Sequence, residues 1–189
     1  EIIASEAERA KKKYGMIVIP GYELTKNNVL NHRSAHIVAL GITQFVRADG
    51  DVVDLAKAVQ ATGALAVAAH PVHTRKMEKQ TYHLWDRRDE LANVIDAWEV
   101  ASGPHIFPEV LASGLPMIAT SDFHRPDHIN AYKTLIDAER HPEAILEAIR
   151  EQRVSFQFYQ EEIVHELRDH SASYCMDRIT IADDIRNLD

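Results

Sequence analysis

Short apolar runs alternate along the chain with longer segments in which apolar and charged residues are spaced as in helices. Apolar runs that end at Pro, Gly or polar residues predict buried strands, and helical spacing predicts amphipathic helices. The predicted strands are Met16–Ile19 (continuing to Glu23), His36–Ile42, Ala64–Ala69, Val94–Val100, Pro116–Thr120 and Val154–Tyr159. The predicted helices are Glu1–Tyr14, Val52–Thr62, Asp86–Asn93, Pro104–Ser113, Pro142–Gln152 and Glu161–His170. This alternation predicts an α/β domain with a largely parallel sheet, either open or closed into a barrel.

Composition narrows the class of protein. The 189 residues suit one domain with a single core, and 46% hydrophobic with 26% charged residues is ordinary for a globular protein. No apolar run approaches the ~18 residues of a membrane span, and no signal peptide is visible. The single cysteine, Cys175, excludes an internal disulfide and favours a reducing cytoplasm. The net charge of −8 argues against stable binding of duplex DNA, although a bound metal would still admit a nucleotide substrate.

Potential metal ligands follow several of the predicted strands. Glu23, His70 and the pair Asp122 and His124 each stand where an apolar run ends. In α/β folds the carboxyl ends of parallel strands converge on one face, where sites are built. Imidazole and carboxylate together suit zinc, manganese or iron better than calcium. The pattern therefore predicts a metal site at this face.

His36 departs from this pattern because it precedes its strand. If that strand runs back along the strand that holds Glu23, with the loop Lys26–Ser34 as the connection, His36 and Glu23 become neighbours. An antiparallel pairing is therefore predicted here. The other histidines outside this set are interpreted as surface residues, since a lone histidine is more often a surface residue than a ligand; they are His32, His83, His105, His128, His141, His165 and His170.

Five segments, taken in order, resemble the later motifs of the polymerase and histidinol phosphatase (PHP) superfamily. They are IPGYELT, HIVALGI, AAHPV, DAWEVAS and ATSDFHRPDH. The longer segment SDFHRPDHIN resembles stand-alone bacterial PHP phosphoesterases more than polymerase domains. The resemblance implies a distorted (β/α)7 TIM-like barrel whose first one or two strands are missing from this chain. Residues 1–160 would form this PHP domain, and residues 161–189 a C-terminal helix and tail.

The resemblance also implies a site for two or three divalent ions, Zn, Mn or Fe. In it Glu23 bridges two ions, His36 and His70 bind the second, Asp122 binds the first and His124 binds the third. The chain departs from the family because no His-x-His motif precedes Glu23. A fragment of a longer protein, a cleaved chain or a degenerate member would each explain this, and the trio Glu23, His36 and His70 is the part that looks complete.

The expected function is metal-dependent hydrolysis of a phosphate ester, with a metal-activated water attacking phosphorus. The substrate would be a nucleotide, an oligonucleotide or a small phosphomonoester. Arg125 is the first candidate to orient phosphate, followed by His73 and Arg75, and Glu99 is a candidate acid/base or ligand-supporting group. Structural ion pairs are the alternative for both Arg125 and Glu99.

Two other functions stay open at this point. A degenerate PHP domain would bind a ligand or partner without catalysis, and a polymerase module would require a reading frame that continues past Asp189. If the barrel lacks strands, its open edge would favour a homo-oligomer.

Overall fold

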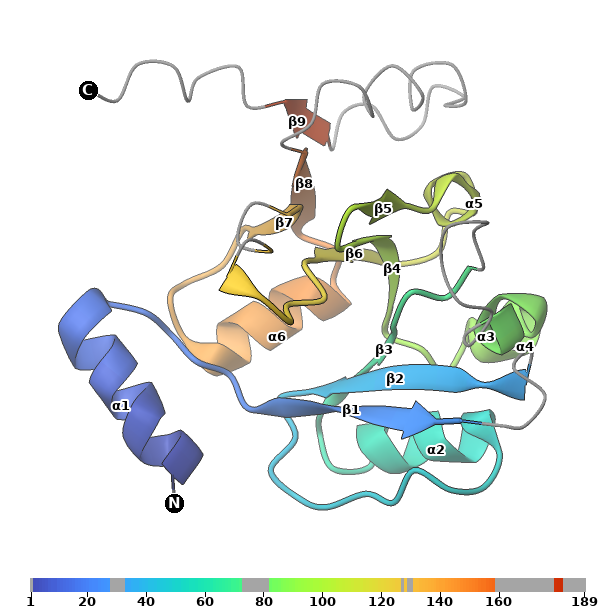
Figure 1. The fold of residues 1–189 in the computed structure, drawn as a ribbon, viewed down its shortest axis with the longest axis horizontal. Helices are drawn as coiled ribbons and strands as arrows, with labels where there is room; N and C mark the ends of the chain where they lie inside the picture. The colour runs from blue at the N-terminus through green and yellow to red at the C-terminus, as the bar shows by residue number, and fades with distance from the viewer. Residues whose placement is uncertain are drawn as a thin grey trace.

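The computed structural model describes residues 2–27, 33–72, 82–126, 128, 131–158 and 179–181 (Figure 1). The helices are α1 (Ile2–Tyr14), α2 (Val52–Gln60), α3 (Tyr82–Asp86), α4 (Arg88–Leu91), α5 (Pro108–Leu111) and α6 (Pro142–Arg150). The strands are β1 (Gly21–Lys26), β2 (Ala35–Leu40), β3 (Leu65–Ala68), β4 (Ala97–Ser102), β5 (His105–Ile106), β6 (Met117–Thr120), β7 (Lys133–Ile136), β8 (Val154–Phe158) and β9 (Ile179–Ile181). The fold is therefore mixed α/β, as predicted.

The described strands form two sheets. One has six strands in the order β1-β2-β3-β4-β5, with β6 paired to β4, and the other has the order β7-β8-β9. In the larger sheet β3 and β6 run parallel to β4, whereas β1, β2 and β5 pair antiparallel. The prediction of a largely parallel sheet is therefore wrong, because the pairs β1–β2, β2–β3 and β4–β5 are antiparallel. No closed barrel is formed by the strands that the structure describes, so the barrel stays an expectation.

Several predicted elements are displaced. The run Met16–Ile19 is no strand, and β1 begins only at Gly21; Met16 and Val18 are exposed, so the apolar run is not buried as a strand would require. The predicted helix Pro104–Ser113 is reduced to α5, because His105 and Ile106 first return antiparallel to β4. Strand β7, which pairs with β8, was not predicted.

Helix ends follow local chemistry more closely. Gly15 has φ +62° and ends α1, with its N–H donating to the Lys11 carbonyl at 3.0 Å. Asp51 caps α2, since its carboxylate accepts from the Val53 N–H at 2.9 Å. Pro142 is the first residue of α6, where its missing N–H costs nothing. The predicted helix Glu161–His170 lies outside the described residues.

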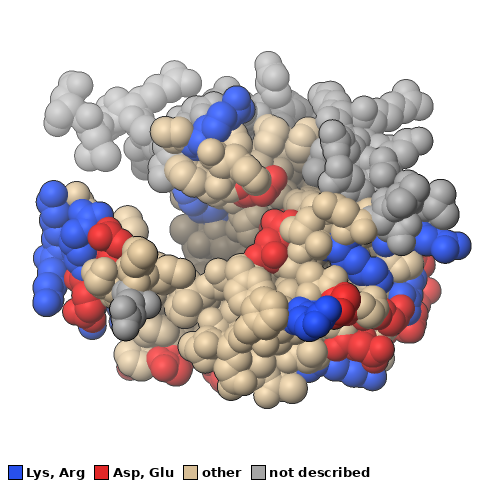
Figure 2. Space-filling model, turned by 60° about the horizontal axis from the view of Figure 1, so that its bottom comes forward, with Lys and Arg blue, Asp and Glu red and all other residues tan. Residues whose placement is uncertain are grey.

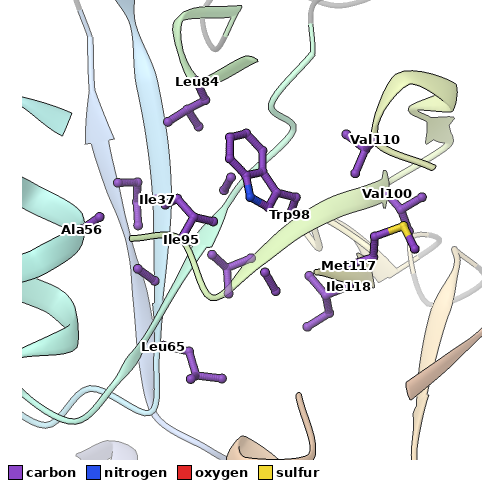
Figure 3. Packing of buried hydrophobic residues seen from close by; sticks show 14 of the residues in the cluster. Ile37, Ala56, Leu65, Leu84, Ile95, Trp98, Val100, Val110, Met117 and Ile118 are labelled. Atoms are coloured by element: carbon purple, nitrogen blue, oxygen red, sulfur yellow. The ribbon is translucent and has the colours of Figure 1, made fainter. Parts of the chain in front are cut away.

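The core surrounds β3 and β4, in which every residue is buried. Figure 3 shows Trp98 and Val100 of β4 among Leu84, Val110 and Met117, which come from α3, α5 and β6. The two tryptophans of the chain stack edge to face, with ring centroids 6.1 Å apart. Polar residues are rare at this depth: Ser34, His36, Glu99 and Ser102 are the buried polar or charged residues of the described chain.

Helix α1 stands beside the rest of the described structure rather than within it (Figure 1). None of its residues is buried, and its basic last turn, Lys11–Lys13, is exposed. In Figure 2 basic side chains gather on this helix at the left, while acidic and basic groups are interspersed over the visible face of the remainder. None of the described helices has the length and apolar character that crossing a bilayer requires.

Candidate metal centre

The pairing of β1 with β2 brings Glu23 and His36 together. The strands are antiparallel, with Thr25 opposite His36, so Glu23 lies diagonally across from His36. His36 Nδ1 is 2.7 Å from Glu23 Oε1. The antiparallel pairing predicted from the sequence is therefore confirmed.

His70 joins this pair from the end of β3. Strand β2 also pairs with β3, and the Ala69 N–H donates to the His36 carbonyl at 3.0 Å, which carries the chain past His36. His70 Nε2 then lies 3.4 Å from His36 Nδ1. One ligand atom each from Glu23, His36 and His70 can be chosen so that all lie within 4.8 Å of one another. Three strands thus place three donors around one point.

Neighbouring groups set the protonation of these donors. His36 Nε2 faces Asn27 Oδ1 at 3.3 Å; because an amide oxygen only accepts, this nitrogen carries a proton. A hydrogen bond from His36 holds the pKa of Glu23 below its usual range, which keeps the carboxylate ionised. Burial lowers the pKa of His70, which favours a neutral imidazole. An ionised carboxylate at Glu23 and a neutral imidazole at His70 are the forms in which these side chains bind metals.

The geometry of this trio fits a divalent cation. Ligands of a tetrahedral ion, bound at about 2.0–2.1 Å, lie about 3.3 Å apart, close to the 3.4 Å between the two histidine nitrogens. Nδ1 of His36 faces both the Glu23 carboxylate and the second imidazole, so a cation could lie between these three groups. One carboxylate oxygen and two imidazole nitrogens suit Zn, Mn or Fe.

Glu99 lies beneath this trio. Its side chain is fully buried, its Oε2 accepts from the His70 backbone N–H at 2.5 Å, and its Oε1 accepts from Thr120 Oγ1 at 2.7 Å. Burial raises the pKa of Glu99 to about 7, although hydrogen bonding with the His70 backbone and with the Thr120 and Ser102 side chains acts in the opposite direction. Glu99 therefore contacts the backbone of a candidate ligand.

Asp122 and His124 lie outside the compact trio. Asp122 follows β6 with φ +45°, and its carboxylate is close enough to His70 to act on the pKa of that residue. His124 is exposed, and its Nδ1 lies 2.8 Å from the Asp122 carbonyl oxygen and 3.4 Å from Asp122 Oδ1. That hydrogen bond with the carbonyl raises the pKa of His124. Their role as metal ligands stays a prediction.

Arg125 and His128 flank the same loop. Arg125 is exposed, and its Nε donates to His128 Nε2 at 3.3 Å. His128 Nδ1 lies 3.1 Å from the Asp122 carbonyl oxygen and 3.2 Å from the backbone nitrogen of His124. His128 is half-buried, and its contacts with Asp122, His124 and Arg125 lie within this loop. His73 and Arg75 lie outside the described residues.

Sequence reasoning missed Asn27, Thr120 and His128 as supporting groups. Thr120 precedes Asp122 by two residues, and the period of two in strands was a usable signal for it. Asn27 stands in the connection between two candidate ligands, but nothing in the sequence says which loop residue reaches His36. His128 was obscured because its contact depends on the loop conformation after Asp122.

Part of the chain matches a family model, and its fold is similar to that of a solved structure. The model of the PHP-associated family, PHP_C, matches residues 111–154, a stretch that includes Asp122, His124 and Arg125. The fold is similar to a two-domain protein from Bacteroides vulgatus that contains a predicted PHP-like metal-dependent phosphoesterase, with a TM-score of 0.59 and 21% identity. That similarity covers 88% of this chain and 53% of the other, so the chain spans about half the length of that protein. No curated protein gives a significant match. The family match thus concerns residues 111–154, and the likeness to the Bacteroides vulgatus protein concerns the fold.

Proposed function

We propose that this chain belongs to the PHP superfamily and forms part of a metal-dependent phosphoesterase. The observation that carries the proposal is the assembly of Glu23, His36 and His70 from three strands into one group of donors. A purely structural role explains this arrangement less well. Two imidazoles with nitrogens 3.4 Å apart stabilise each other little without a cation between them.

Each residue of the trio has a definite task in this proposal. Glu23 supplies an ionised oxygen, while His36 and His70 supply nitrogens whose orientation is set by Asn27 and by the backbone of β3. When bound, the divalent ions would neutralise phosphate charge and activate water for in-line attack on phosphorus. Two or three ions are proposed, with Asp122 and His124 as the donors for those beyond the trio.

The loop after β6 would receive the substrate. Arg125 is exposed beside Asp122 and His124, and a guanidinium binds phosphate oxygens in a bidentate manner. In the proposed role it orients the phosphoryl group, with His73 and Arg75 as further candidates. The proposed substrate is a phosphorylated small molecule or a short nucleotide. The proposed compartment is the reducing cytoplasm.

Hydrolysis with added Mn²⁺ tests this function. The chain is expected to hydrolyse p-nitrophenyl phosphate, its bis-ester or a short oligonucleotide, and His70→Ala is expected to reduce turnover to background. His141→Ala is the matched control, because His141 is exposed and pairs with Glu143 at α6. Full activity in His70→Ala would contradict the site assignment.

The alternative is a PHP domain that binds a ligand without catalysis. The observation that favours it is that Asp122 and His124 lie outside the compact trio among the described residues. Metal binding by the wild-type chain together with no turnover of any of the three substrates would support this alternative over the enzyme.

A further inference from the structure

Glu99 is a buried carboxylate that requires a physical explanation. Its exposed fraction is 2%, and no ion pair with a basic side chain is found for it among the described residues. Burying a carboxylate is costly unless specific donors compensate. An apolar residue in the middle of β4 would avoid that cost. The hydrogen-bond partners of the carboxylate must therefore explain its presence.

The two oxygens of Glu99 connect the ends of two strands. Oε2 accepts from the His70 N–H just beyond β3, and Oε1 accepts from Thr120 Oγ1, the last residue of β6. Strand β4 lies between β3 and β6 and runs parallel to both. The side chain therefore acts as a crosslink between the strand ends that lead to His70 and Asp122.

Both of those residues have unusual backbone conformations. The φ angle is +30° at His70 and +45° at Asp122, in the left-handed region that side chains other than glycine rarely adopt. Such conformations persist when the surroundings hold them. Glu99 binds the N–H of His70 itself, and it binds Thr120 two residues before Asp122.

The strand that carries Glu99 is locally modified. The register of β4 with β6 shifts between Glu99 and Ala101, as in a β-bulge. Bulges redirect side chains and occur often beside functional sites. The neighbours of Glu99 in β4, Trp98 and Val100, belong to the apolar cluster of Figure 3.

We propose that Glu99 is a positioning residue: its carboxylate fixes the backbone of His70 and the end of β6, and thereby sets the ligand geometry without touching ion or substrate. This inference rests on the metal centre of the proposed function. Of the two roles considered for Glu99, acid/base group or support for a ligand, it selects the second, because both oxygens are already engaged and the side chain is out of reach of solvent.

The chain contains a matched control for this role. Asp96, which precedes β4, accepts from the Ala66 N–H of β3 at 2.8 Å and from Gln60 Nε2 at 3.1 Å. It is thus also a carboxylate bound to the β3 backbone, but near the opposite end of that strand from His70. Substitution of Asp96 tests whether the loss of any carboxylate hydrogen bond to the β3 backbone disturbs the metal centre.

The first experiment measures Mn²⁺ and Zn²⁺ affinity by titration calorimetry. Glu99→Ala is expected to weaken binding about 10- to 100-fold, whereas Glu99→Gln and Asp96→Ala are expected to stay within about threefold of wild type. Glutamine keeps both bonds, because its carbonyl accepts from the His70 N–H and its amide donates to Thr120 Oγ1. A loss in Glu99→Gln as large as in Glu99→Ala, an equal loss in Asp96→Ala, or no loss in Glu99→Ala would each overturn the proposal.

Thr120 provides a second route if Glu99→Ala fails to fold. Thr120→Val removes the hydroxyl donor at nearly constant volume and is expected to weaken metal affinity, while Thr120→Ser restores it. Unchanged affinity in a folded Thr120→Val would contradict the crosslink between β4 and β6.

A metal-free measurement separates this inference from the proposed function. Amide hydrogen exchange at His70 is expected to accelerate about tenfold or more in Glu99→Ala and to stay slow in Glu99→Gln. If the wild-type chain binds no metal, the proposed function fails, but this exchange result still decides whether Glu99 holds His70. Equal exchange rates in wild type and Glu99→Ala would overturn the positioning role.

Discussion

At the scale of single residues, the centre depends on the facing atoms of His36 and Glu23. Nδ1 and Oε1 are 2.7 Å apart, so a proton that lies between them would bond both atoms. A cation would take the place of that proton, because it needs the lone pairs of both atoms. Protons and metal therefore compete for the same position.

This competition predicts the direction of the pH dependence. Burial lowers the pKa of His70, so this imidazole is available to a metal near neutral pH, but protons occupy the imidazoles as the pH falls. We expect Zn²⁺ affinity to fall as the pH is lowered from 7.5 to 5.5, because an imidazole must lose its proton to bind a metal. Calorimetry in buffers of different ionisation enthalpy would also detect the released proton. An affinity that is constant over this interval would mean that histidines are not the ligands.

At the scale of elements, helix α2 shows how local chemistry and one distant contact together fix a boundary. Asp51 caps the helix and also accepts from both Nη atoms of Arg87, which binds Glu90 in turn. Hydrogen bonds from Arg87 lower the pKa of Asp51 to about 2, below its ordinary value of 3.8. The stability that this ionised group contributes is therefore present above about pH 4 and is lost as the pH falls toward 2.

Substitution of Asp51 tests this boundary. We expect Asp51→Ala to lower the free energy of unfolding by about 1–2 kcal/mol at pH 7, chiefly through the lost cap, since the half-exposed ion pair adds little. Asp51→Asn keeps a capping oxygen and should lose less. Asp89→Ala, at a side chain 96% exposed, should change stability by less than about 0.5 kcal/mol. Urea unfolding of the three variants at pH 7 and pH 3 measures these changes in the free energy of unfolding. If Asp51→Ala lowers that free energy equally at both pH values, the ion pair with Arg87 contributes nothing and this part of the account is wrong.

The success of sequence reasoning also differs between elements. The ends of α1, α2 and α6 were predictable because Gly15, Asp51 and Pro142 act within their own turn. The run Met16–Ile19 was misassigned because apolar character does not say whether a partner strand is present. Strand β7 was missed because its pairing with β8 is a tertiary contact that its own short sequence does not encode.

At the scale of the whole molecule, the centre is made by strands that are distant in sequence. Glu23, His36 and His70 meet because β1, β2 and β3 are adjacent in one sheet, and the antiparallel return of β2 explains how a residue at a strand start joins residues at strand ends. That part of the site was predictable, since motif order and one loop length suffice. The positions of Asp122 and His124 relative to the trio were not, because they depend on an exposed loop whose conformation is set by His128 and Arg125.

The metal content of the purified chain tests the central claim most directly. Elemental analysis is expected to find at least one equivalent of Zn, Mn or Fe per chain, and His70→Ala is expected to lose it while His141→Ala keeps it. Two or more equivalents would add Asp122 and His124 to the centre. A wild-type chain that holds no metal, even after supplementation with Zn²⁺ and Mn²⁺, would contradict the account.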